Sequence, residues 1–189
     1  MKNIDQLMSD YIPTTDCKGL SINNWLDIYK EIKKKYKESQ CDYYKRNNAS
    51  DDVLNLVSLE SKRFGSISEK IIISLLNLGP RKSTEHDGIK KGKKIEIKSA
   101  RYWGSKDECK WQHLELTHDY DCVLFCLIDF DGTWKIWGIR KELLFGELRE
   151  KGILSYQGKQ GWWTNKSQVI EYCSVIKGLC DLDNFLDTV

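Results

Sequence analysis

The sequence has no run of apolar residues that approaches the roughly 20 needed to cross a membrane. Its first five residues, Met1 to Asp5, contain no apolar signal segment either. We therefore expect a protein without a membrane partner, located inside the cell in the cytoplasm. Internal repeats, low-complexity segments and a linker that would divide two domains are also missing, so the 189 residues are expected to form one domain.

An excess of charge of one sign is lacking as well. Lys and Arg together number 30 against 28 Asp and Glu, which leaves a formal net charge of +2. So small a net charge gives no basic field over the whole protein of the kind that attracts nucleic acids. Any surface that binds nucleic acid must therefore be a local one.

Cysteine pairs with metal-ligand spacing are also absent. The seven cysteines are scattered along the chain, and no two of them form a Cys-x-x-Cys pair. We therefore expect neither a zinc site nor a disulfide framework, and reduced thiols agree with an intracellular compartment. Cys122 and Cys126 lie inside an apolar run and are interpreted as small core residues.

The first third of the chain is expected to be helical. Apolar spacing predicts helices over 21–38, 51–62 and 66–78, joined by a polar connection over 40–50. The last turns of the first helix are rich in lysine, which indicates either a solvated helix end or a contact with phosphates. The third helix is apolar nearly all round, so we expect it to be buried.

The remaining chain predicts a sheet. Strands are expected over 84–89, 93–101, 121–130 and 133–139; the third is a continuous apolar run, typical of a strand buried on both faces. The segment 102–120 is polar and irregular. We further predict a helix over 140–150, a loop over 158–165 with exposed Trp162 and Trp163, a strand over 168–176 and a helix over 178–187. This order indicates an α/β (α+β) fold with a central mixed sheet of four to five strands flanked by helices.

One predicted strand carries residues suited to metal-dependent chemistry. Ile95 and Ile97 point to one face of this strand, while Glu96 and Lys98 point to the other. A hairpin would bring Asp87 close to Glu96. Two carboxylates, with the carbonyl of Ile97 between Glu96 and Lys98, are enough protein ligands for Mg²⁺, which keeps several waters. Alternatively, Glu96 and Lys98 form only a salt bridge on the strand.

Further residues could join this site. Glu69 either closes a capping box that starts at Ser66 or faces the site, and the two roles can coexist. Gln112 and His113 could project toward the same place, whereas His86 is interpreted as structural. His113 and His118 are conceivable metal ligands without supporting spacing. Basic residues around the strand suggest a DNA-facing cleft, although those at the hairpin tip could simply be solvated: Lys90, Lys91, Lys93, Lys94 and Arg101.

These residues resemble the PD-(D/E)xK nuclease superfamily. The resemblance covers about residues 64–139 and follows the order helix, strand, strand, strand of an αβββαβ core, with His86 in place of the proline. It implies that Asp87, Glu96 and Lys98 are the catalytic triad. Glu69 would be the acidic residue on the helix, which some members use to bind the metal or the water. Gln112 would be an accessory position. The implied cofactor is Mg²⁺, with Mn²⁺ as a substitute.

The small size and the lack of helicase or ATPase motifs resemble type II restriction endonucleases. That resemblance implies a homodimer that cuts double-stranded DNA at a specific sequence. Residues 1–63 would be an N-terminal helical region, 64–139 the catalytic core, and 140–189 a region for recognition and dimerisation. The alternatives are a repair nickase, a junction resolvase or a transposon end-cleaving nuclease with the same core, or a DNA-binding protein without catalytic activity.

Overall fold

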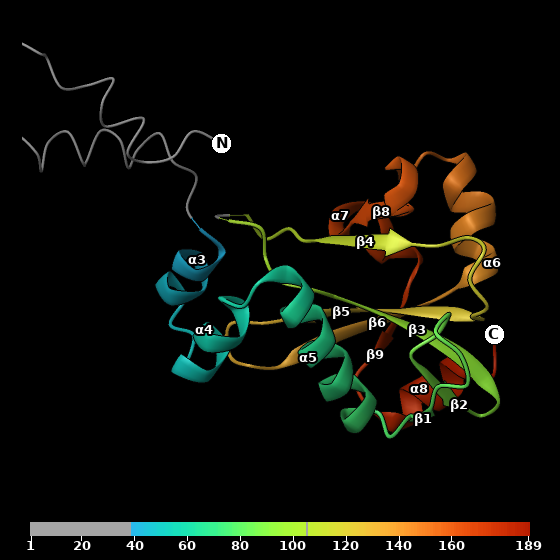
Figure 1. Ribbon diagram of the computed structural model, residues 1–189, viewed down its shortest axis with the longest axis horizontal. Helices are drawn as coiled ribbons and strands as arrows, with labels where there is room; N and C mark the ends of the chain where they lie inside the picture. The colour runs from blue at the N-terminus through green and yellow to red at the C-terminus, as the bar shows by residue number, and fades with distance from the viewer. Residues whose placement is uncertain (1–38, 105) are drawn as a thin grey trace, which may run out of the picture. The chain divides into compact units, whose positions relative to one another are not determined.

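A computed structural model describes residues 39–104 and 106–189 of the protein (Figure 1). The helix predicted over 21–38 lies outside these residues. The described residues form a mixed α/β fold with a six-stranded mixed sheet, a separate three-stranded sheet and flanking helices. None of the helices in this part of the chain is long and apolar enough to span a membrane.

Two short capped helices open the described chain. Helix α3 (Gln40–Arg46) is capped by Ser39, and α4 (Asp51–Val57) is capped by Ser50. The predicted polar connection over 40–50 is therefore wrong for most of its length. Helix α3 is held by a contact with a distant part of the chain, since its buried Tyr44 donates a hydrogen bond of 2.5 Å to the carbonyl of Ile128.

Helix α5 (Ser61–Leu75) begins earlier than predicted and passes through Gly65 without a break. A glycine inside a helix costs about 1 kcal/mol relative to alanine, which the burial of a phenylalanine such as Phe64 more than offsets. Ser66 lies inside the helix, so the predicted capping box with Glu69 is wrong. The helix is also buried on one side only, since Leu75 is 56% exposed.

The six-stranded sheet has the order β1-β2-β3-β5-β6-β9. Strands β3 and β5 pair in parallel, and every other neighbouring pair in this sheet is antiparallel. Every residue of β5 is buried, which confirms the prediction from its apolar run. The strands comprise β1 (Gly79–Pro80), β2 (Gly88–Lys90), β3 (Lys93–Ala100), β5 (Cys122–Ile128), β6 (Trp134–Arg140) and β9 (Ser174–Ile176).

A second sheet of three strands was not predicted. It has the order β4-β8-β7 and includes β4 (Lys110–Leu114), β7 (Ser155–Tyr156) and β8 (Trp162–Asn165). Strand β4 falls in the segment 102–120 that was expected to be irregular, and β8 takes up half of the predicted loop over 158–165. The buried Trp111 of β4 stacks on Phe125 with ring centroids 4.6 Å apart, so this sheet packs on the central one.

The C-terminal helices mostly follow the predictions. Helix α6 (Lys141–Leu143) continues into the π-helical η1 (Leu144–Leu148), and α8 (Leu179–Leu186) forms where a helix was expected. The predicted strand over 168–176 is largely wrong. Only β9 is extended there, because α7 (Lys166–Val169) and the 3₁₀ turn η3 (Ile170–Tyr172) precede it.

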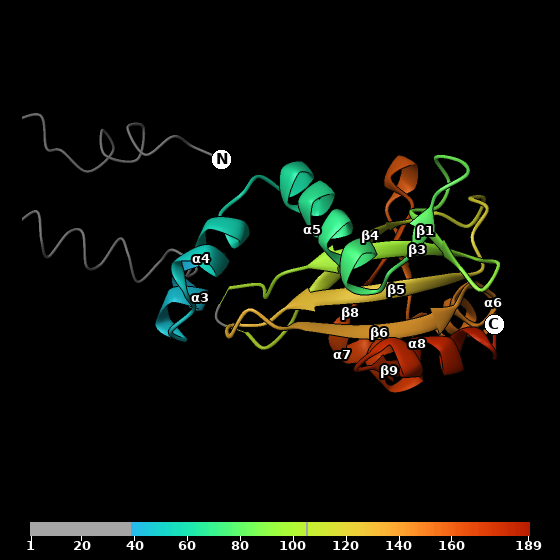
Figure 2. The same ribbon diagram turned by 90° about the horizontal axis from the view of Figure 1, so that it is seen from below.

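The central sheet separates two apolar cores. Figure 1 shows it nearly edge-on, with β4, β8 and α6 on one side and α5 and α8 on the other; Figure 2 gives the perpendicular view. Ile95 and Ile97 of β3 pack in the core that α5 and α8 cover. The next residues along the strand therefore face the side of β4.

Candidate active site

The alternation of β3 presents Glu96 and Lys98 to the side of the sheet that carries β4. Ile95 is fully buried and Ile97 is 6% exposed on the opposite side. The apolar core thus fixes the register of β3, because a shift by one residue would bury both charged side chains beneath α5 and α8. The two charged residues are held in place by the packing of their neighbours.

The β2–β3 hairpin brings Asp87 to Glu96, as predicted. Gly88 pairs with Ile95, so continuing this register by one residue places Asp87 opposite Glu96. The amide of Asp87 donates to the carbonyl of Ile95 at 2.9 Å, and its Oδ2 accepts a hydrogen bond from the amide of Ile97 at 2.7 Å. These contacts anchor the carboxylate of Asp87 against the edge of β3.

Glu96 and Lys98 form a short ion pair in the same place. Lys98 Nζ lies 2.5 Å from Glu96 Oε1, and Glu96 is only 7% exposed. Burial raises the pKa of Glu96 to about 7, and the nearby carboxylates of Asp87 and Glu69 act in the same direction, while Lys98 opposes them. The site therefore gathers more negative charge than one lysine compensates.

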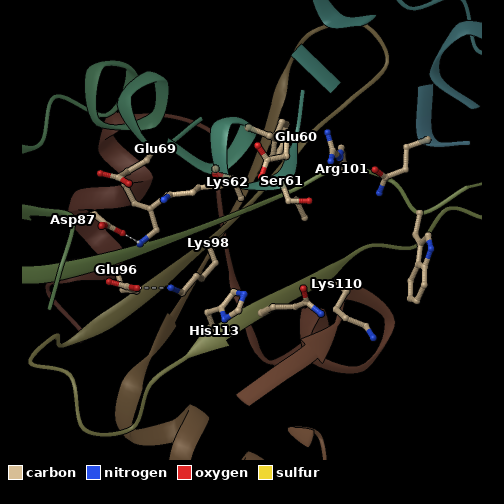
Figure 3. A pocket seen from close by; sticks show the side chains of 18 residues that line it. Glu60, Ser61, Lys62, Glu69, Asp87, Glu96, Lys98, Arg101, Lys110 and His113 are labelled. Atoms are coloured by element: carbon tan, nitrogen blue, oxygen red, sulfur yellow. Dashed lines mark hydrogen bonds and ion pairs between the residues drawn. The ribbon is translucent and has the colours of Figure 1, made fainter. Parts of the chain in front are cut away.

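Glu69 reaches the site from helix α5. Burial raises the pKa of Glu69 above the usual value for a glutamate, and the carboxylate of Asp87 contributes to that rise. Figure 3 shows Glu69, Asp87, Glu96 and Lys98 together on one side of the pocket. Of the two roles considered for Glu69, the structure supports the one at the site.

These side chains line an open pocket with a volume of about 740 Å³. Its walls come from the start of α5, from β3 and the residues after it, and from β4. Gln112 and His113 both line it, as predicted, whereas His118 does not. The pocket extends from the acidic side to Arg101 and Lys110 on the other side (Figure 3).

His113 enters the pocket from an irregular point in β4. The register between β4 and β8 shifts between Trp111 and Leu114, and His113 has a φ of 58°. Positive φ is uncommon for a residue with a side chain and costs of order 1–3 kcal/mol. A bulge of this kind redirects side chains, and here the affected residues line the pocket.

Most of the predicted DNA-contacting residues lie elsewhere. Lys90, Lys91, Lys93 and Lys94 do not line the pocket, and each has a partner of its own. Those partners are the carbonyl of Leu76, the carboxylate of Asp187, the terminal residue Val189 and the carboxylate of Asp119, respectively.

Arg101 lines the pocket, but its guanidinium binds to other parts of the chain. Its guanidinium donates hydrogen bonds to the carbonyls of Val57 and Leu59 and lies 4.8 Å from the ring centre of Phe64. Burial lowers the pKa of Arg101 below its usual value. We interpret it as the residue that fastens the link between α4 and α5 to the end of β3.

His86 is structural, as predicted. It is 1% exposed; its Nε2 accepts a hydrogen bond from the amide of Lys82 at 3.1 Å, and its Nδ1 lies 3.1 Å from Ser83 Oγ. Both ring nitrogens are used inside the loop that precedes Asp87. This histidine therefore shapes the approach of the chain to the site.

The donor set at the site suits a hard cation. Within the described part of the chain, Asp87 Oδ1 and Glu96 Oε2 make no hydrogen bond, so each carboxylate keeps one oxygen for a ligand. Residues 39–104 and 106–189 contain no group of three or more His, Cys, Asp or Glu side chains arranged to enclose a metal ion. Mg²⁺ does not require such an enclosure, because it retains several waters and binds through one or two carboxylates.

Several pocket residues were not predicted as site residues. Lys62, Trp103 and Lys110 line the pocket beside the residues that were. The spacing of Lys110 and Gln112 would have indicated a shared strand face, had β4 been recognised as a strand. The signal was missed because the partner of β4 lies about fifty residues downstream, in β8.

Comparison with protein-family models, with curated proteins and with solved structures finds no match for this chain.

Proposed function

We propose that this protein is a Mg²⁺-dependent DNA endonuclease of the PD-(D/E)xK type, with Mn²⁺ able to replace Mg²⁺. The observation that carries the proposal is the convergence of Asp87, Glu96 and Lys98 on one open pocket, beside Glu69 from α5. Two carboxylates with unused oxygens and an adjacent lysine are the groups that metal-assisted hydrolysis of a phosphodiester requires.

The order of elements supports the same proposal. Helix α5 is followed by β1, β2 and β3 in antiparallel pairs, and β3 then pairs in parallel with β5. This sequence of elements agrees with an αβββαβ core up to its third strand. The chain departs from that order after β3, where strand β4 stands in the place of the second helix. We include a restriction-endonuclease-like core as part of the proposal.

The residues at the site have distinct parts in the proposed reaction. Asp87 and Glu96 would hold the cation, which supplies Lewis-acid stabilisation of the charge that develops on the phosphate. Lys98 is fixed by Glu96, so its ammonium can contact a phosphate oxygen or orient the attacking water. Glu69 binds a proton more readily than an ordinary glutamate and can accept one from that water.

The narrower form of the proposal is a type II restriction enzyme that acts on double-stranded DNA as a homodimer. A nickase, junction resolvase or transposon end-cleaving nuclease would use the same site on a different substrate. Fragments of fixed length from linear duplex DNA would support the restriction enzyme, and a preference for junctions or mismatches would support the others. DNA binding without any uptake of Mg²⁺ or Mn²⁺ in calorimetry would support a DNA-binding protein without catalytic activity.

The direct test is cleavage of plasmid, branched and single-stranded DNA, in Mg²⁺ and separately in Mn²⁺, by the wild type and two variants. We expect Lys98→Ala to lower the cleavage rate at least about 100-fold, within the range typical of a lost acid–base or charge-stabilising group. The control Lys91→Ala removes a lysine of the same hairpin that lies outside the pocket, and it should cut like the wild type. Equal rates for all three proteins, or no cleavage of any substrate with either metal, would contradict the proposal.

A further inference from the structure

An indole–ammonium–indole stack stands at the far side of the pocket from the carboxylates. Lys110 Nζ lies 3.6 Å from the ring centre of Trp163 and 4.9 Å from that of Trp103. In the described part of the chain no carboxylate lies within ion-pair distance of Lys110, and its ammonium contacts the two indole rings instead. Trp103 and Lys110 both line the pocket.

The backbone of Trp103 is fixed by a hydrogen bond, whereas its side chain is exposed to solvent. Its amide donates a hydrogen bond of 2.7 Å to the carbonyl of Glu108, which fixes the residue beyond the end of β3. The side chain stays among the most exposed large hydrophobic groups of the described chain, at 53% exposure. Lys110 therefore lies over one face of an indole that is about half open to solvent.

The stack lies near the proposed catalytic group along the chain. Trp103 lies five positions after Lys98, and extended chain spans at most about 17 Å over that length. At about 3.4 Å per nucleotide along one strand of a duplex, this distance covers about five nucleotides. A strand whose phosphate is cleaved at Glu96 and Lys98 can therefore reach Trp103 within about five nucleotides.

We propose that the open face of Trp103 stacks on an unpaired base of the DNA strand that is cleaved, with Lys110 supplying positive charge beside it. This inference rests on the proposed nuclease function and names its substrate class: DNA with at least one unpaired base close to the cleaved phosphate. Among the forms of that function, it favours an enzyme that acts on junctions or mismatches over a restriction enzyme that acts on intact duplex DNA. A base inside an intact duplex has both faces covered by its neighbours, so it cannot present a face to the indole. The charge of Lys110 favours a polyanion over an apolar protein segment, and stacking on exposed aromatic rings is how proteins commonly hold unpaired bases.

The test measures dissociation constants in EDTA, where no metal-dependent cleavage occurs. The probes are a blunt duplex, the same duplex with a short unpaired tail, and the tailed duplex with abasic sites in the tail. We expect the wild type to bind the tailed probe about tenfold more tightly than either other probe, a typical contribution of one stacked base. Trp103→Ala should remove this preference without changing the affinity for the blunt duplex, and Trp103→Phe should keep most of it.

Tyr156→Ala is the matched control, because Tyr156 is an aromatic residue of the second sheet, 65% exposed and outside the pocket. This variant should bind all three probes like the wild type. Equal affinity of the wild type for the tailed and abasic probes would overturn the inference, and that comparison needs no variant. If the protein cuts DNA in Mg²⁺ but shows no preference for the tail, only this inference fails; if it neither binds nor cuts any DNA, the proposed function fails with it.

Discussion

The carboxylate of Asp87 takes the place of a strand partner for Ile97, since its Oδ2 accepts the amide hydrogen bond of Ile97 at 2.7 Å. Strand β2 pairs with β3 only as far as Ile95, and beyond that point the edge of β3 has no further partner in β2. One oxygen of Asp87 thus completes the edge of the sheet and leaves the other for a ligand. The aspartate has a structural role and a proposed chemical role at once.

These two roles can be separated by substitution. Asp87→Asn keeps an acceptor oxygen, so we expect its free energy of unfolding in EDTA to stay within about 0.5 kcal/mol of the wild type. Asp87→Ala leaves the Ile97 amide without its partner, which should cost about 1 kcal/mol. Both variants should lose Mg²⁺ binding and cleavage. Urea unfolding and metal calorimetry measure the two effects, and undiminished Mg²⁺ binding by Asp87→Asn would exclude this residue as a ligand.

Glu96 should make the metal-free protein less stable as the pH rises. Its pKa is about 7 in the fold and near 4.5 when exposed, so between these values the folded state holds a proton that the unfolded state has released. The free energy of unfolding in EDTA should therefore fall between about pH 4.5 and 7, by on the order of 1–3 kcal/mol, and level off above.

Glu96→Gln is the comparison, because it keeps the shape of the side chain and removes the titration. Its stability should be flatter over the same pH range, as measured by urea unfolding in parallel with the wild type. Saturating Mg²⁺ should also flatten the wild-type curve, since a bound cation favours the charged carboxylate. Parallel curves for the two proteins in EDTA would show that Glu96 does not titrate in this range.

Local sequence patterns predicted the centre of the fold because its signals lie within short windows. The alternation of Ile95 to Lys98, the apolar run of β5 and the spacing from Asp87 to Glu96 each depend on residues that are neighbours in the chain. The turn of the β2–β3 hairpin could likewise be predicted from neighbouring residues, because it contains a glycine. Gly92 and Lys91 both have positive φ, as a tight turn between antiparallel strands requires.

The features that the sequence did not predict depend on contacts between distant parts of the chain. Strand β4 pairs with β8, and the lysines of the β2–β3 hairpin meet acidic or carbonyl groups such as Asp187 and Val189 at the far end of the sequence. No window around Lys91 or Lys93 contains those partners. The structure gives these lysines ion pairs and backbone contacts, and their role at a DNA surface stays a prediction.

Arg101 should contribute to the stability of the fold more than to DNA affinity. Arg101→Ala removes two hydrogen bonds to carbonyls at the end of α4 together with the contact to Phe64, which should cost about 1–3 kcal/mol. Arg101→Lys should recover only part of this loss, because an ammonium lacks the planar fork of donors. Urea unfolding measures the stability. An unchanged stability with a weaker affinity for DNA would instead support the prediction that Arg101 contacts DNA.

His113 offers a case in which stability and activity should move in opposite directions. Its φ of 58° is unfavourable for a side chain and ordinary for glycine, so His113→Gly should leave the protein as stable as the wild type or up to about 1 kcal/mol more stable. The imidazole lines the pocket, and its loss should lower the cleavage rate about tenfold or more.

The matched control is Lys91→Gly, because Lys91 has a φ of 50° in a turn outside the pocket. It should relieve the same kind of strain and leave cleavage unchanged. His113→Ala removes the ring and keeps the strain, so it should cut as slowly as His113→Gly while being less stable. The measurements are thermal unfolding and the initial cleavage rates of the three variants. If the imidazole of His113 is needed for cleavage, His113→Gly is stable and cuts slowly. Full activity of His113→Gly would show that the bulge affects only the backbone course of β4.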